Sequence, residues 1–341
     1  MFKGRNILVT GSQGFIGRNL VAELVKRGAY VRGTLHQRIS DHLPDKVEYV
    51  KADLTDKKDC QAVVQDMDCV FMCAANTSGA AVIANNPLAH VTPNVLMNTC
   101  MLDAAYHAKV QKFVFISSSI VYPDTGATPT FEEEAFIGDP YESYFSAGWM
   151  KRYGELLCRT YSEKIRNPMM TVVLRPSNVY GPFDKFDFER SHVTASLIRK
   201  VIEGRDPLDV WGTGEDIRDL IFIDDFLEGL LLATEQLHSF SPVNIASGRG
   251  YKVKEILDAI IGVVGRGVPQ VVFDPSKPSM VPIRLMNIKK AQRLLGFVPK
   301  TTLEEGLRKT IHWYQAYYGH GSQGPHMDKE GCSSPSEKTI A

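Results

Sequence analysis

A glycine-rich turn near the amino terminus constrains the fold of this chain more than any other feature. Gly11, Gly14 and Gly17 lie directly after the apolar run Asn6–Thr10 and directly before an amphipathic helical pattern. Gly11 permits a tight turn, Gly14 lets backbone amides approach a diphosphate, and Gly17 lets the helix pack close to the strand. The amino terminus of that helix would then face phosphate charge. The turn therefore predicts a dinucleotide-binding strand–turn–helix unit.

Short strand-like apolar runs recur through the first half of the chain, with helical patterns between them. After the first run, they lie at about residues 30–31, 47–50, 69–73, 113–117 and 170–174. Strands that alternate with helices at this spacing form a parallel sheet with helices on both faces. The predicted fold class is α/β, a doubly wound parallel sheet of the Rossmann type with a smaller carboxy-terminal α/β lobe.

The rhythm of strands and helices changes after residue 175, which predicts a second part of the chain. Within the first part, a strand at 220–223 and a helix at 224–236 are expected to return to the main sheet. We expect a dinucleotide-binding domain made of residues 1–178 and about 210–236, and a substrate-binding lobe made of 179–209 and 237–318. Residues 319–341 are expected to form a flexible tail, because they contain few apolar side chains to bury.

Charge and apolar content exclude several classes of protein. The 39 Lys and Arg residues equal the 39 Asp and Glu residues, so the chain lacks the basic footprint of a nucleic-acid-binding protein. No apolar stretch approaches the ~20 residues that cross a bilayer, and the amino terminus has no signal-peptide cleavage pattern. Six cysteines without a Cys-x-x-Cys pair or a Cys/His cluster suit a reducing cytoplasm and predict no metal site. We expect a cytoplasmic protein with no nucleic-acid, membrane or metal partner.

Further motifs give the chain a resemblance to a known family. The turn reads Thr-Gly-Ser-Gln-Gly-Phe-Ile-Gly, and matching signatures follow at residues 117–122, 175–182, 218–225 and 295–306. Together they resemble the extended short-chain dehydrogenase/reductase superfamily, in its nucleotide-sugar epimerase and dehydratase branch. Shorter matches at 84–87, 181–184 and 191–193 are similar to GDP-fucose synthase and, more distantly, GDP-mannose 3,5-epimerase. The resemblance implies a nicotinamide cofactor and a nucleotide-diphosphate sugar, with a GDP-sugar as the first expectation and a homodimer as the assembly.

The resemblance also implies which residues contact the cofactor. Asp53 and Leu54 are expected near the adenine. The other expected contacts, besides the three glycines, are Phe15, Ile16, Ala74, Ala75 and Lys151. The choice between NADP and NAD rests on the end of the second strand, where enzymes that prefer NAD place an acid. No acid stands there, whereas His36 and Arg38 could meet a 2′-phosphate. These residues favour NADP and leave NAD open.

The motif that would carry the chemistry is incomplete. In the family, Tyr-x-x-x-Lys places a phenol beside a lysine ammonium, which lowers the pKa of the phenol, while a serine orients the sugar oxygen. The resemblance assigns Ser118 and Lys151 to this set, but Ala147 occupies the tyrosine position. Tyr144 is seven residues before Lys151, which makes it a poor substitute in a regular helix. We interpret Ala147 as an engineered substitution; the alternative is a natural pseudoenzyme.

The residues around the serine bear on the type of reaction. Dehydratase relatives carry an acid after the catalytic hydroxyl residue, where this chain has Ser119 and Ile120, so dehydration is disfavoured. Ile120 also replaces a cysteine of GDP-fucose synthase, which puts a full double epimerisation in doubt. His192 matches the family's second acid/base and could exchange a proton beside a 4-keto group.

Three functions remain in order of preference. The first is a nucleotide-sugar epimerase that acts through a keto intermediate, the second an NADPH-dependent 4-keto-sugar-nucleotide reductase, and the third a sugar-nucleotide-binding pseudoenzyme. In each, Ser119, Asn178, His192 and Arg218 are expected to bind the substrate. Asn178 and Arg218 would hold the diphosphate, because a guanidinium can donate two charge-assisted hydrogen bonds to phosphate oxygens.

Overall fold

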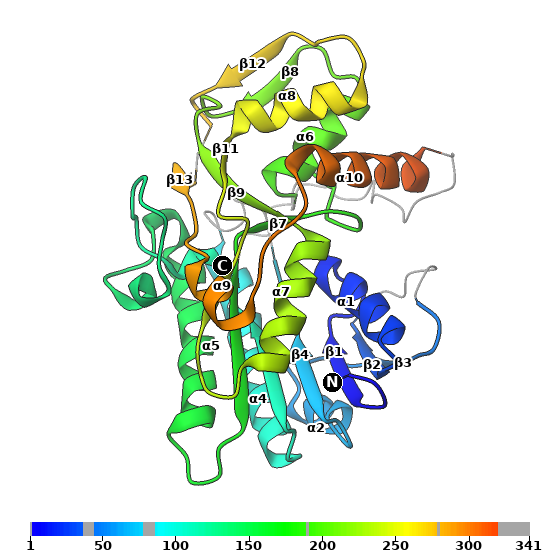
Figure 1. The fold of residues 1–341 in the computed structure, drawn as a ribbon, viewed down its shortest axis with the longest axis vertical. Coiled ribbons are helices and arrows are strands. Elements are labelled where there is room, and N and C mark those ends of the chain that lie inside the picture. The colour runs from blue at the N-terminus through cyan, green and yellow to red at the C-terminus, as the bar shows by residue number, and fades with distance from the viewer. Residues whose placement is uncertain (1, 37–43, 78–85, 189–190, 278–279, 320–341) are drawn as a thin grey trace, which may run out of the picture.

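The computed structural model describes residues 2–36, 44–77, 86–188, 191–277 and 280–319, and its larger part is a seven-stranded sheet (Figure 1). Every neighbouring pair of strands in it is parallel. Its spatial order is β10 (Val243–Ile245), β6 (Met170–Pro176), β5 (Lys112–Ile116), β4 (Cys69–Met72), β1 (Asn6–Thr10), β2 (Tyr30–Leu35) and β3 (Val47–Lys51). The order reverses between β1 and β4, and ligands of such sheets bind where the carboxyl ends of the strands flank this reversal. The predicted fold class is confirmed.

Helices cover both faces of this sheet, because its strands are apolar on both faces. Ile7 and Val9 of β1 pack in one core with α1 (Phe15–Lys26) and α7 (Ile223–Gln236). Leu8 points to the other face and packs in a second core with α2 (Lys57–Val63), α4 (Pro87–His107) and α5 (Phe145–Glu163). No helix within the described residues is long and apolar enough to span a membrane.

The remaining elements form a second, smaller part, at the top of Figure 1. In one small sheet, β9 (Ile217–Phe222) pairs with β7 (Asn178–Tyr180), β11 (Gly250–Lys252) and β13 (Ile283–Arg284), and in another, β8 (Leu208–Trp211) pairs with β12 (Val271–Asp274). The helices α6 (Val193–Ile202), α8 (Val253–Val264) and α10 (Leu303–Tyr318) pack together beside these sheets, whereas α9 (Lys289–Leu295) packs on α7.

One strand prediction is wrong. The strand predicted at 220–223 is β9, and it lies in the four-stranded sheet and not in the main one. The strand that does return is β10, whose Val243 pairs with Leu174 of β6. The predicted helix between them is confirmed, since α7 packs on β6 and β10. The two strands flank the same helix and both end in apolar residues, so periodicity alone does not tell which one joins which sheet.

Candidate active site

The glycine turn lies where the strand order reverses, between β1 and β4. Gly11 has φ +61°, and a Cβ atom built on it would lie 2.8 Å from the Cα atom of Ala74. A Cβ atom on Gly17 would lie 2.2 Å from the carbonyl oxygen of Gly11. Gly14 adopts an extended conformation and begins α1 without a side-chain cap. The turn therefore closes against the end of β4 only because side chains are absent at Gly11 and Gly17.

The same turn carries hydrogen-bond donors suited to a negatively charged ligand. The Nε2 atom of Gln13 is buried and has no hydrogen-bond partner among the described residues, although buried amide donors are normally paired. Beside it, the backbone amides of Phe15 and Ile16, in the first turn of α1, have no acceptor within the helix. Donors without acceptors, next to positions where only glycine fits, suit the diphosphate of a dinucleotide.

The ends of β2 and β3 carry the residues predicted near the adenosine. Asp53 follows β3, and its Oδ1 accepts hydrogen bonds from the backbone N–H and the hydroxyl of Thr55 at 2.9 and 2.7 Å. These bonds, with His36 nearby after β2, hold the pKa of Asp53 below its usual value. Leu54 is buried in the core beneath α2. Arg38 lies outside the described residues.

The segment after β4 is tied to the end of β1. The Thr10 hydroxyl oxygen accepts hydrogen bonds from the backbone N–H groups of Cys73 and Ala74, both at 3.0 Å. Ala74 in turn lies against Gly11, and Ala75 follows it. The structure thus brings the glycine turn and the predicted Ala-Ala pair to one surface.

Lys151 lies on α5 beside the end of β5. Its Nζ atom donates to the carbonyl oxygen of Ile116 at 2.8 Å and lies 5.1 Å from the centroid of the Phe115 ring. Burial lowers the pKa of Lys151 to about 8, although Glu155 and Cys73 act in the opposite direction. A part-buried ammonium acts more strongly on a charge that develops nearby than an ammonium in bulk water does.

Ser118 caps the short 3-10 turn η1 (Ser119–Val121) that follows β5. Its hydroxyl oxygen accepts the backbone N–H of Ile120 at 3.3 Å. A hydroxyl that accepts one hydrogen bond still has its hydrogen to donate, so Ser118 can also bind a sugar oxygen. Ser119, predicted to bind substrate, is buried at 7% exposure.

Ala147 occupies the first turns of α5 and is 1% exposed. A Cβ atom on the next residue, Gly148, would lie 2.6 Å from the carbonyl oxygen of Ile120, so this end of α5 packs tightly on η1. Tyr144 precedes the helix, at the end of the 3-10 turn η3 (Glu142–Tyr144), and burial raises its pKa while the charges of Arg218 and Arg284 lower it. Tyr144 therefore lies toward these arginines of the smaller part.

A buried polar network fixes α5 one turn beyond Lys151. Glu155 accepts hydrogen bonds from Arg175 and from the hydroxyl of Ser117, and Arg175 also donates to the Tyr122 hydroxyl at 3.0 Å. From the sequence, Arg175 is identified only as the first residue of the 175–182 motif, and Glu155 is not among the predicted site residues. The position of Glu155, four residues after Lys151, was the signal that could have identified it as a residue that positions the lysine.

The smaller part supplies two adjacent arginines. Arg218 of β9 is opposite Arg284 of β13 in the parallel register of the two strands. Arg218 donates to the Val281 carbonyl at 2.8 Å and forms an ion pair with Asp216 at 3.1 Å. Asn178 donates to the Asp219 carbonyl at 3.3 Å. Arg284 cannot be identified from the sequence alone, because only the pairing of distant strands places it beside Arg218.

His192 immediately precedes α6 and lies near the loop that joins the two parts. The residue is exposed, yet desolvation by the surrounding protein and then the nearby Lys185 ammonium lower the pKa of His192. Lys185 donates to the carbonyl oxygen of Thr77 at 3.3 Å and also to its hydroxyl. Because Thr77 lies just beyond β4, this contact connects the loop to the surface formed by the glycine turn.

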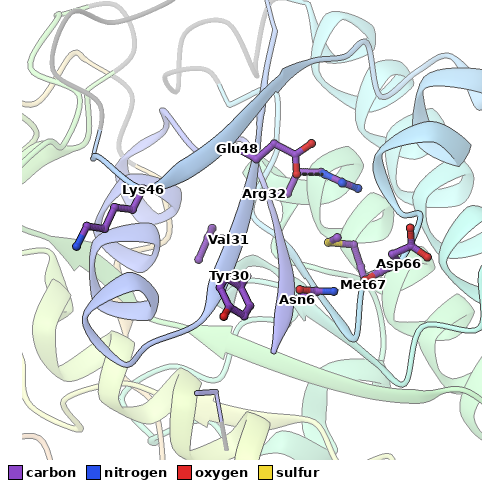
Figure 2. A pocket seen from close by; sticks show the side chains of 8 residues that line it. All are labelled: Asn6, Tyr30, Val31, Arg32, Lys46, Glu48, Asp66 and Met67. Carbon is purple, nitrogen blue, oxygen red and sulfur yellow. Dashed lines mark hydrogen bonds and ion pairs between the residues drawn. The ribbon is translucent and has the colours of Figure 1, made fainter. Parts of the chain in front are cut away.

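A cavity of about 310 Å³ lies at the opposite end of the main sheet (Figure 2). Its lining includes Asn6, Tyr30 and Glu48, which lie near the amino ends of β1, β2 and β3. Ligands of such sheets bind beyond the carboxyl ends of the strands, so this cavity is separate from the candidate site.

Comparison with known proteins gives matches over most of the chain. A family profile described as "NAD dependent epimerase/dehydratase family" matches residues 7–246. Probable GDP-L-fucose synthase 1 of Oryza sativa subsp. japonica is 29% identical over 325 residues, which cover 92% of this chain and 92% of the relative. A dTDP-4-dehydro-6-deoxy-D-allose reductase of Streptomyces is 29% identical over 325 residues, 92% of this chain and 97% of the relative. GDP-mannose 3,5-epimerase 1 of Oryza sativa subsp. indica is 29% identical over 314 residues, 90% of this chain and 81% of the relative.

Solved structures agree with this match. UDP-glucose 4-epimerase of Thermotoga maritima, solved with UDP-glucose, superposes with a TM-score of 0.80 at 27% identity and covers 91% of this chain and 99% of its own. UDP-glucose 4-epimerase of Thermus thermophilus, solved in complex with NAD, superposes with a TM-score of 0.80 at 25% identity. The match covers 91% of this chain and 99% of the epimerase chain.

Proposed function

The chain belongs to the NAD dependent epimerase/dehydratase family, and on that premise we propose that it is a nucleotide-sugar epimerase that acts through a keto intermediate on a GDP-sugar. The observation that carries this proposal is the position of Lys151. Its amine lies beside the carbonyl oxygen of Ile116, at the end of β5, next to the two strand ends that carry the glycine turn and Ala74. A cationic group at that point can stabilise the negative charge that develops on a sugar hydroxyl oxygen beside the cofactor as its proton is removed.

The cofactor is a nicotinamide dinucleotide, which supplies a hydride acceptor and donor when bound. We propose NADP, because none of residues 36–38, at the end of β2, is an acid and His36 stands there. Gly11, Gly14 and the amides after them would hold the diphosphate, with Gln13 as a further donor. Asp53 would accept a hydrogen bond from the adenine, and Lys151 would contact the nicotinamide ribose.

The remaining residues are proposed to bind and activate the sugar nucleotide. The Ser118 hydroxyl orients the sugar oxygen. His192 is neutral at pH 7 because its pKa is lowered, so it can remove a proton from the carbon beside the keto group. Arg218 and Arg284, with Asn178, bind the diphosphate by charge-assisted hydrogen bonds.

A second candidate function is the NADPH-dependent reduction of a 4-keto sugar nucleotide. The observation that favours it is the similarity to a dTDP-4-dehydro-6-deoxy-D-allose reductase over 92% of this chain. Net consumption of NADPH would indicate the reductase, whereas a recycled cofactor would indicate the epimerase. The third reading, a protein that only binds sugar nucleotides, requires that no substitution at Ala147 restores turnover.

We also propose a homodimer that packs on α4 and α5. Phe145, Trp149, Tyr153 and Leu156 are 36–54% exposed and follow one another at helical spacing along α5. A stripe of large exposed apolar side chains marks a protein-contact surface. Sedimentation of the full chain tests this: Trp149→Glu should give a monomer if the proposal is right.

A thermal-shift screen of GDP-, UDP-, CDP- and dTDP-sugars, with and without NADP, tests the proposed function. A GDP-sugar should raise the melting temperature most, and the shift should grow when NADP is present, since both ligands bind the folded state. The absence of a shift with every sugar nucleotide contradicts the proposal. A larger shift with NAD than with NADP contradicts the cofactor choice alone.

A further inference from the structure

Asp219 lies between two residues that are proposed to hold the diphosphate. It follows Arg218 directly in β9, and its backbone carbonyl oxygen accepts a hydrogen bond from Nδ2 of Asn178 at 3.3 Å. Because side chains alternate along a strand, the Asp219 carboxylate points to the face of β9 opposite to that of Arg218. Its exposed fraction is 0%. Asp219 can therefore affect a bound sugar nucleotide only through its neighbours.

Hydrogen-bond donors from two distant segments surround the Asp219 carboxylate. Its Oδ1 accepts hydrogen bonds from the backbone N–H and the hydroxyl of Ser247 at 3.0 and 2.8 Å. Its Oδ2 accepts the backbone N–H of Gly248 at 3.0 Å and that of Met286 at 3.3 Å. Ser247 and Gly248 follow β10, the edge strand of the main sheet, and Met286 follows β13. One carboxylate thus joins β9 both to the main sheet and to the segment that leaves β13.

The segment around β13 also orients the Arg218 guanidinium. Nη1 of Arg218 donates to the carbonyl oxygens of Val281 and Pro282 at 2.8 and 3.3 Å, just before β13 begins. The bond between Met286 and Asp219 holds the same segment just beyond the other end of β13. Asp219 therefore fixes both the strand that carries Arg218 and the backbone carbonyls that orient its guanidinium.

Arg284 is fixed in a different way. Its Nη1 donates to the carbonyl oxygen of Pro123 at 3.2 Å, in the segment that follows η1 of the larger part. Arg284 is thus bonded directly to the part of the molecule that carries the main sheet. A change at Asp219 should displace Arg218 more than Arg284.

Burial makes the Asp219 carboxylate a costly group to keep for stability alone. The loss of water around it raises the pKa of Asp219 to about 6, although hydrogen bonds from Ser247 and Met286 act in the opposite direction. A carboxylate that is ionised at pH 7 costs free energy to bury, and its hydrogen bonds offset that cost only in part. The cost favours a role besides stability.

We propose that Asp219 is the positioning residue for Arg218, and that its carboxylate holds the guanidinium where it can bind the diphosphate of the sugar nucleotide. This role rests on the proposed function. Asp219→Asn keeps the size of the side chain but replaces one acceptor oxygen with an NH2 group, which only donates. At least one of the backbone N–H groups around the carboxylate then loses its acceptor, so β9 and the segment after β13 should shift relative to the main sheet.

A double-mutant cycle tests this role with four proteins: the unsubstituted chain, Asp219→Asn, Arg218→Ala and the double variant. Calorimetric titration with GDP-mannose or UDP-glucose, whichever gives the larger thermal shift, measures each affinity. Asp219→Asn should weaken binding by about tenfold in the unsubstituted chain and by less than about threefold in the Arg218→Ala background. The affinity for NADP should not change, because the glycine turn follows β1 and β10 lies at the far edge of the sheet.

Asp225→Asn is the matched control. Asp225 of α7 is 5% exposed, and its Oδ2 accepts the backbone N–H groups of Lys300 and Thr301 at 3.2 and 2.9 Å. Its substitution should lower the melting temperature and leave the affinity for the sugar nucleotide unchanged.

Ser247→Ala is a milder variant that keeps the Asp219 carboxylate and removes one of its donors. It should weaken binding of the sugar nucleotide by about two- to fivefold. This variant carries the test should Asp219→Asn fail to fold.

A second measurement requires no ligand. In protein labelled with ¹⁵N-arginine, the Nε resonance that disappears in Arg218→Ala should move in Asp219→Asn and in Ser247→Ala, and it should stay in place in Asp225→Asn. A resonance that neither of the first two substitutions moves contradicts the proposal.

The affinities separate this role from a purely structural one. An affinity that Asp219→Asn does not change, an equal loss in both backgrounds, or an equal loss in Asp225→Asn overturns the role of Asp219. If the unsubstituted chain binds neither sugar nucleotide, the proposed function is wrong and this role is wrong with it. With binding intact, the other outcomes overturn only the role of Asp219.

Discussion

Glu155 accepts two hydrogen bonds from Arg175, from Nε at 2.9 Å and from Nη2 at 2.6 Å, and both side chains are 1–2% exposed. The pair joins α5 to β6, one helical turn beyond Lys151. A buried ion pair contributes little net stability, but removing one partner leaves an uncompensated charge. This pair therefore fixes the helix that carries the proposed catalytic lysine.

Glu155→Gln should destabilise the protein by about 3–5 kcal/mol, because it leaves the Arg175 guanidinium buried without a counter-charge. Urea unfolding at pH 7 measures this change. Glu163→Gln is the control, since Glu163 pairs with Arg159 on the exposed surface of the same helix and its loss should cost less than about 1 kcal/mol. Equal effects of the two substitutions contradict the assigned role of the buried pair.

Gly14→Leu should weaken NADP binding by at least about tenfold, or 1.4 kcal/mol, without unfolding the protein. A Cβ atom on Gly14 has one close neighbour, the carbonyl oxygen of Gly11 at 3.2 Å, so the folded chain can accommodate a side chain there. The same side chain would occupy the space proposed for the diphosphate. Calorimetric titration with NADP gives the affinity. Gly262→Leu, where a Cβ atom meets nothing within 4 Å, is the control. An unchanged affinity in Gly14→Leu removes the glycine turn from the cofactor site.

Asp184→Asn should stabilise the protein at pH 8 and have little effect at pH 4. Burial raises the pKa of Asp184 to about 7, so between its unfolded pKa and pH 7 the folded state binds more protons than the unfolded state. Stability from this group is therefore complete below pH 4 and is lost as the pH rises to 7, by up to about 4 kcal/mol. Unfolding curves at pH 4, 6 and 8 measure the difference. If the difference in free energy of unfolding between Asp184→Asn and the unsubstituted chain is the same at all three pH values, the pKa of Asp184 is not raised in the folded state.

Arg284→Ala should weaken binding of a GDP-sugar by about 10- to 100-fold, because a charge-assisted hydrogen bond contributes about 1.5–3 kcal/mol. Affinity for NADP should not change, since Arg284 lies in the smaller part. Titrations with each ligand separate the two effects. Arg266→Ala serves as the control, because Arg266 is exposed and donates to the Ile202 carbonyl. Should Arg284→Ala and Arg266→Ala bind the sugar nucleotide equally well, the diphosphate lies elsewhere.

Local sequence features predicted most of the main sheet and the glycine turn between β1 and α1. Gly11, Gly14 and Gly17 act within one strand–turn–helix unit, so their spacing alone identifies the turn. Local periodicity, in contrast, does not indicate which sheet a strand joins, so the positions of β9 and β10 could not be predicted in this way.

Long-range contacts explain what the sequence did not predict at the site. Arg284 becomes a candidate only through the register of β13 with β9. Ala147, in contrast, could be identified from the sequence, because it breaks a motif with fixed spacing.

The central claim is that this chain oxidises a sugar nucleotide at the Lys151 site, and turnover after Ala147→Tyr tests it most directly. With the sugar nucleotide that gives the largest thermal shift, this substitution should raise the rate by about 10²–10⁴-fold, because a phenol beside the Lys151 ammonium restores an acid/base in the pocket. Adding Lys151→Met to it should remove the gain. No gain from Ala147→Tyr, or fast turnover by the unsubstituted chain that survives Lys151→Met, would contradict the account.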